Sequence, residues 1–163
     1  MYYPLFINLA EKKALIVGGG NVGSRRALYL LKAGAIVTVV SEEFDKQIAS
    51  IKNRNLKLLK KKLSSKNIDD IKPEDYFLVV LASNDQKINS EMSARIARIC
   101  KKSNNKAALV CRTDNHLKGN VIFPSVSQIG KNTVAFTTYG KNPILSRKVK
   151  GCLARLCKTT QKE

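Results

Sequence analysis

A glycine-rich segment, Gly18-Gly19-Gly20-Asn21-Val22-Gly23, directly follows the apolar run at 14–17 and opens a stretch with helical periodicity. The G-x-G-x-x-G spacing between a strand and a helix is typical of turns that bind a dinucleotide diphosphate. Gly18 lets the chain turn tightly, Gly20 lets the backbone approach the diphosphate, and Gly23 lets the helix pack close to the sheet. The free N–H groups of the helix then face the phosphates. We predict nucleotide binding here, with a purely structural turn as the alternative.

Acidic residues stand at two further places where such a site needs them. Glu42 and Glu43 lie about 20 residues beyond Gly23, the interval expected for a partner of the ribose hydroxyls. Their charge disfavours a 2′-phosphate and so favours NAD over NADP. Asp114 follows the last predicted strand, where its carboxylate is placed to accept a proton. The alternatives are charges that suit a helix start for the glutamates, and a loop aspartate bonded to its own backbone for Asp114.

Metal-binding patterns are missing from the sequence. The four cysteines form no C-x-x-C pair, and the single histidine, His116, is far from them along the chain. We therefore predict no metal site, reduced structural thiols and a solvated His116.

The elements that position these residues alternate between strand and helix patterns. An edge strand is expected at 2–9, core strands are expected at 13–17, 35–40, 56–60, 76–81 and 107–111, and helices are expected at 21–33, at 42–52 and after Asn84 or Asp85. Gly34 suits the residue that ends the first helix. This order predicts an α/β fold, a Rossmann-type doubly wound parallel sheet.

The pattern changes beyond Asp114. Segments 125–129 and 133–138 flank Gly130-Lys131-Asn132 as in a hairpin, and Pro143 after Asn142 suits the start of a helix. One hairpin and one amphipathic helix cannot enclose a core alone. We predict an NAD-binding Rossmann domain at 1–114 and a small α+β dimerisation module at 115–163.

The composition limits the class of protein. In 163 residues the formal net charge is +18, and 44% of residues are hydrophobic. No apolar run is long enough for a membrane span, and the N-terminus lacks a leader pattern, so we expect a cytoplasmic protein. The charge favours a polyanionic partner, but no nucleic-acid recognition motif accompanies it.

Several motifs in order along the chain resemble one known family, the sirohaem synthase N-terminal domains, which are precorrin-2 dehydrogenases. The motifs are Pro4-Leu5-Phe6, the segment 15–22 with Arg25-Arg26, Ala82-Ser83-Asn84-Asp85 with Asn89, Asp114 before Pro124-Ser125, and the stretch from Thr137 to Arg147. The resemblance implies NAD-dependent oxidation of precorrin-2 to sirohydrochlorin by a homodimer.

The resemblance also implies site residues. It places Asn21, Val22, Glu42 and Glu43 along the NAD site, Ala82, Ser83, Asn84 and Asp85 beside the nicotinamide end, and Asp114 in the catalytic role. Basic and polar residues that flank the matching motifs are candidates for the substrate carboxylates: Lys118, Lys131, Thr138, Lys141 and Arg147.

The sequence departs from the family at several positions. Cys111-Arg112-Thr113 stands before Asp114, where Asn-Val-Val is common, and Tyr139 and Asn142 replace a usual Gly and Ser. The chain ends at Glu163, shortly after the first helix of the region that other members extend, which disfavours metal insertion. The alternatives are a bifunctional dehydrogenase and ferrochelatase, and a non-catalytic nucleotide-sensing module.

Overall fold

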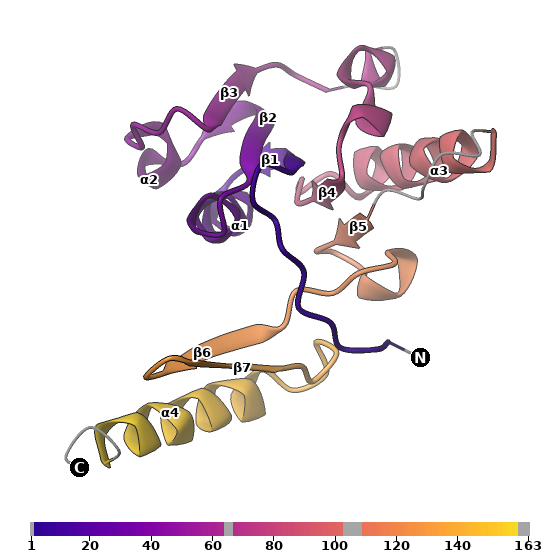
Figure 1. Ribbon diagram of the computed structural model, residues 1–163. Helices are drawn as coiled ribbons and strands as arrows, with labels where there is room; N and C mark the ends of the chain where they lie inside the picture. The colour runs from indigo at the N-terminus through magenta and orange to yellow at the C-terminus, as the bar shows by residue number, and fades with distance from the viewer. Residues whose placement is uncertain (1, 64–66, 103–108, 160–163) are drawn as a thin grey trace. The chain divides into compact units, whose positions relative to one another are not determined.

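The computed structural model describes residues 2–63, 67–102 and 109–159, which divide into two compact units, 1–121 and 122–163 (Figure 1). The first unit contains one parallel sheet with the strand order β3-β2-β1-β4-β5. Its strands are β1 (Lys13–Gly19), β2 (Ile36–Phe44), β3 (Leu56–Lys60), β4 (Leu78–Leu81) and β5 (Leu109–Arg112). The predicted doubly wound α/β fold is confirmed.

Helices pack on both faces of this sheet because the central strands are apolar on both faces. α1 (Asn21–Lys32) packs on β1 at Ile16, and α3 (Gln86–Lys102) brings Met92 and Ile96 into a buried cluster with Leu15 and Val17. Neighbouring residues of a strand point to opposite faces, so α1 and α3 lie on opposite faces of β1. The carboxyl ends of the parallel strands form one edge of the sheet, and the chain leaves this edge from β1 to α1 and from β4 to α3.

Two predicted helix ends are confirmed. Gly34 has a φ of +81°, and the amides of Gly34 and Ala35 donate to Leu31 and Leu30 at 3.0 Å, the pattern that ends a helix at a left-handed residue. Asp85 caps α3, since its carboxylate accepts from the amides of Lys87 at 2.8 Å and Ile88 at 3.2 Å.

The predicted helix at 42–52 is wrong. β2 continues through Phe44, because Gly19 pairs with Phe44 and the amide of Lys61 donates to the carbonyl of Ser41 at 2.9 Å. Only α2 (Lys46–Ala49) follows, and Asp45 caps it through a 2.8 Å bond from the amide of Gln47. The ladder partners on both sides of β2 outweigh the preference of glutamates for a helix start.

The predicted edge strand at 2–9 is also wrong. Residues 2–9 have no strand conformation and pair with no strand of the described chain, and Tyr3, Leu5 and Phe6 are exposed. Although β3 and β5 have free outer edges among the described residues, residues 2–9 pair with neither of them. Of the predicted strand 107–111, residues 107 and 108 lie outside the described residues.

Short helical turns complete the first unit: η1 (Ile68–Ile71), η2 (Pro73–Asp75) and η3 (His116–Lys118). In the second unit, β6 (Ser125–Ile129) and β7 (Asn132–Phe136) form the predicted hairpin, and α4 (Pro143–Thr159) packs against β6. Asn142 caps α4 through a 2.8 Å bond from the amide of Leu145 to its Oδ1. No described helix is long and apolar enough to cross a membrane.

Candidate functional site

The turn from β1 to α1 leaves no room for a Cβ at Gly18, Gly19 or Gly23. Gly18 has a φ of +112°, and a Cβ there would lie 2.4 Å from the carbonyl oxygen of Ala82. A Cβ on Gly23 would lie 1.9 Å from the carbonyl oxygen of Gly18. The turn therefore packs directly against the end of β4, and α1 packs directly against the turn. Both agree with the roles predicted from the glycine spacing.

Gly20 differs from these glycines. It precedes α1 with extended backbone, at φ −75°, and a Cβ added there would meet nothing within 4 Å. Glycine has no side chain to cap a helix, and the first turn of α1 carries no acidic residue. The backbone amides of Asn21, Val22 and Gly23 thus begin a helix beside open space. A diphosphate needs this combination, so the turn fits a dinucleotide.

Glu42 and Glu43 lie near this turn, although they are in a strand and not in the predicted helix. β2 carries them along the carboxyl edge of the sheet, and a Cβ on Gly19 would lie 2.5 Å from the carbonyl oxygen of Glu43. Glu42 forms an exposed ion pair with Lys62 at 3.3 Å. The structure therefore brings both glutamates to the side of the turn where strand order places a ribose partner.

The segment Ala82–Asp85 lies on the other side of the turn. The amide of Ala82 donates to the carbonyl of Val17 at 2.8 Å, which joins the ends of β4 and β1. These two strands flank the position where the strand order of the sheet reverses. Ligands of open α/β sheets bind at that position, outside the carboxyl ends of the strands. Ser83 and Asn84 lead from it into α3.

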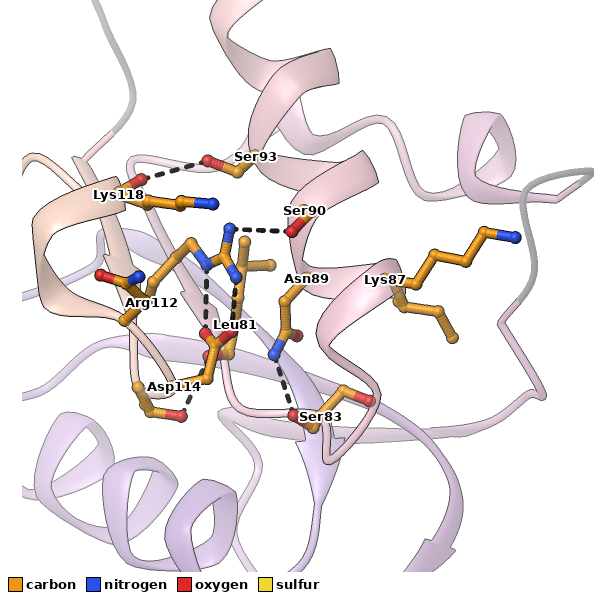
Figure 2. Close-up of polar contacts among 12 residues, drawn as sticks. Leu81, Ser83, Lys87, Asn89, Ser90, Ser93, Arg112, Asp114 and Lys118 are labelled. Carbon is orange, nitrogen blue, oxygen red and sulfur yellow. Dashed lines mark hydrogen bonds and ion pairs between the residues drawn. The ribbon is translucent and has the colours of Figure 1, made fainter.

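Asp114 lies two residues beyond β5 in a polar cluster that Figure 2 shows between β5 and α3. The guanidinium of Arg112 contacts both carboxylate oxygens, with Nε donating to Oδ1 at 3.1 Å and Nη2 paired with Oδ2. Nη1 donates to the hydroxyl of Ser90 at 3.2 Å. The Arg112 side chain is 4% exposed and that of Asp114 is 14% exposed. A largely desolvated ion pair therefore lies at the carboxyl edge.

Asn89 connects this cluster to the segment after β4. It is fully buried in α3, and its Nδ2 donates to the carbonyl of Ser83 at 2.9 Å. Thr113 holds the segment after β5 against β4, since its hydroxyl donates to the carbonyl of Leu81 at 3.1 Å. Asn89 of α3 and Thr113 thus hold the segments around Asp114 and Ser83 close to each other, and the nicotinamide end is predicted at Ser83.

The pKa of Asp114 is lowered from its ordinary value, chiefly by the hydrogen bonds from Arg112. Burial opposes this shift, and the positive charge of Arg112 and the Asn89 side chain add to it. Asp114 is therefore a carboxylate at neutral pH, able to hold a positive charge or to accept a hydrogen bond.

The predicted substrate residues are divided between the units. Lys118 lies in η3 of the first unit, where its carbonyl accepts a 3.3 Å bond from Ser93. Lys131, Lys141 and Arg147 are exposed residues of the second unit. Thr138, also in the second unit, bonds to the carbonyl of Asn142 at 3.3 Å. Their role toward a substrate stays a prediction.

Arg112 and Ser90 escaped the sequence prediction of the site. Arg112 is identified from the sequence only as a departure from the family pattern. A charged residue that ends the apolar strand Leu-Val-Cys-Arg, two positions before Asp114, was the available signal. A cation and a carboxylate only two positions apart can reach each other, so the pair could have been anticipated.

The glycine turn and its neighbours belong to a segment with known relatives. A family model described as "Putative NAD(P)-binding" matches residues 5–125. The siroheme synthase of Buchnera aphidicola is 36% identical over 148 residues, 90% of this chain and 28% of that protein. The siroheme synthase of Zymomonas mobilis is 30% identical over 156 residues, 95% of this chain and 31% of that protein. The chain therefore spans about a third of the length of these curated relatives.

Two further relatives are closer to this chain in length. A Methanocaldococcus jannaschii protein named "Putative precorrin-2 dehydrogenase" is 29% identical over 161 residues, which are 96% of this chain and 74% of that protein. The solved structure of SirC, precorrin-2 dehydrogenase, has a TM-score of 0.74 at 26% identity and covers 98% of this chain and 76% of that chain.

Proposed function

The chain belongs to the NAD(P)-binding family whose model covers its residues 5–125, and from this membership we propose that it is an NAD-dependent precorrin-2 dehydrogenase. It would oxidise precorrin-2 to sirohydrochlorin in sirohaem biosynthesis. One observation carries the proposal. The glycine turn with its open position at Gly20 shares the carboxyl edge of one sheet with the Arg112–Asp114 ion pair. Relatives named as siroheme synthase and precorrin-2 dehydrogenase support the substrate.

Each part of the site has a task in this reaction. The amides of Asn21 to Gly23 bind the diphosphate of NAD, and Glu42 or Glu43 accepts from the ribose hydroxyls. Residues 82–85 orient the nicotinamide end. NAD⁺, when bound, supplies a hydride acceptor. The oxidation removes one hydride and one proton from the macrocycle, and Asp114 accepts the proton or stabilises the charge left behind.

The second unit supports a homodimer in this proposal. None of its described side chains is fully buried, and Ile144 on α4 is 60% exposed while Leu145 is 45% exposed. A second copy that covers such side chains would gain the free energy of apolar burial. Sedimentation of the purified protein at several concentrations tests this: a monomer at every concentration would contradict it. The cytoplasmic location stays a prediction.

The decisive experiment is an anaerobic assay with purified precorrin-2 and NAD⁺. NADH and sirohydrochlorin should form in equal amounts, and product formed equally fast without NAD⁺ would contradict the proposal. Asp114→Asn should keep NAD affinity within about twofold and lower kcat by about a hundredfold or more. Asp75→Asn, at an exposed aspartate, is the matched control. A nucleotide-sensing module would bind NAD with no turnover.

A further inference from the structure

Arg112 occupies an unusual position for a cation. It is the last residue of a strand that is otherwise apolar, and its side chain is almost completely removed from water. Removing a guanidinium from water is unfavourable unless its N–H groups find acceptors. Here Nε and Nη2 are paired with the two oxygens of Asp114, and Nη1 donates to Ser90. The burial of Arg112 therefore depends on the acceptors that Asp114 and Ser90 supply.

This geometry fixes the Asp114 carboxylate in orientation. A planar guanidinium that contacts both oxygens of a carboxylate restrains its rotation, which a single lysine ammonium cannot do. The bond to Ser90 connects the same guanidinium to α3, so both β5 and α3 hold the carboxylate in place (Figure 2). A carboxylate has about four lone-pair positions, and the guanidinium of Arg112 occupies two of them.

We propose that Arg112 is a positioning residue for the dehydrogenase reaction, which holds the Asp114 carboxylate at the carboxyl edge in one orientation. This inference rests on the proposed function, because it assigns Asp114 a role in turnover. It concerns a feature of this chain, since the resembling family commonly has valine where Arg112 stands. Arg112 acts through Asp114 and need not contact the substrate.

The ionised form follows from the groups around the carboxylate. The groups that lower the pKa of Asp114 are Arg112, the backbone of Asp114 itself and the Asn89 side chain on α3, while burial raises it. Asn89 and the backbone are uncharged, so Arg112 is the only charged group among these three. Replacing Arg112 by a neutral residue leaves burial as the main influence, and burial favours the protonated acid.

Three variants separate orientation from charge. Arg112→Met removes both, Arg112→Lys keeps a positive charge without the two-point contact, and Arg98→Met removes an exposed arginine of α3 as the matched control. Turnover of precorrin-2, NAD affinity and the carboxyl ¹³C titration of Asp114 are measured for each, with Asp114→Asn used to assign the resonance. The titration does not depend on any enzymatic activity.

Arg112→Met should raise the Asp114 titration midpoint and the acidic limb of kcat/KM together, by about one pH unit or more. Arg112→Lys should keep the low midpoint yet lose about tenfold or more in kcat, with NAD affinity within about twofold. Should Arg112→Met not fold, the lysine variant alone decides. Full kcat in Arg112→Lys overturns the positioning role, as does an unchanged midpoint in Arg112→Met. If the wild-type protein has no turnover while Arg112→Met still shifts the Asp114 titration midpoint, the proposed function is refuted instead.

Discussion

Gly20→Ala should separate cofactor binding from folding. The backbone of Gly20 is extended at φ −75°, which alanine adopts without strain, and the added methyl group meets nothing within 4 Å. Replacing glycine by alanine at a compatible position stabilises a protein by about 0.4–1 kcal/mol, because the unfolded chain loses freedom. The free energy of unfolding should therefore stay unchanged or rise slightly.

NAD affinity should respond in the opposite direction. If the diphosphate lies over Gly20, the methyl group enters occupied space, and overpacking costs about 1–3 kcal/mol. Each 1.4 kcal/mol is about tenfold in Kd, so the Kd for NAD should rise by about 5- to 150-fold. Isothermal titration calorimetry measures this change, and urea unfolding of the unliganded protein measures stability.

Two other glycines provide contrasts for this experiment. Gly151→Ala adds a methyl group in open space on α4, so it should leave NAD affinity unchanged. Gly23→Ala places its Cβ 1.9 Å from the backbone oxygen of Gly18, so it should destabilise the fold by about 1–3 kcal/mol. A Gly20→Ala protein that folds and binds NAD as tightly as the wild type would refute the placement of the diphosphate.

Three further predictions concern other parts of the first unit. Gly34→Ala should lower the free energy of unfolding in urea by about 1 kcal/mol, since alanine is strained at φ +81°; an unchanged midpoint would argue against the left-handed helix end. Replacing Glu42 and Glu43 together by glutamine should reduce the preference for NAD over NADP by about tenfold in the ratio of Kd values, and a constant ratio would remove both from ribose recognition. Because the folded pKa of Asp114 lies below its ordinary 3.8, its stabilising contribution is complete above that value and is lost as the pH falls through the folded pKa. Wild-type and Asp114→Asn unfolding curves should therefore converge at acidic pH, and parallel curves would show that the pair contributes nothing.

The strands, the glycine turn and the caps were predictable because each depends on short-range chemistry. An apolar run with β-branched residues indicates a buried strand, and Gly34 and Asp85 mark helix ends through their own backbone and side-chain bonding. The edge strand at 2–9 and the helix at 42–52 were wrong because tertiary partners decided them. Pairing with Gly19 kept Phe44 in β2, and residues 2–9 pair with neither edge strand of the sheet.

The sequence predicts the parts of the candidate site that depend on residue spacing. It does not predict the parts that depend on contacts between distant elements. The interval from Gly23 to Glu43 predicted that the glutamates lie near the turn, even though their secondary structure was predicted wrongly. The bond from Arg112 to Ser90 joins residues that are 22 positions apart, on a strand and a helix. Only the packing of α3 on the sheet brings them together.

Gly18 packs against the backbone of Ala82, which is 64 residues later in the chain. During synthesis, β1 emerges long before β4. A nascent chain that has completed only β1, β2 and β3 therefore lacks the contact that completes the glycine turn. NAD can then recognise only the fully assembled sheet, and a ligand that binds solely the native form adds stability by mass action, about 2.7 kcal/mol at a hundredfold excess over Kd. Cellular dinucleotide would thereby act as a selective stabiliser of chains whose late strands have docked correctly.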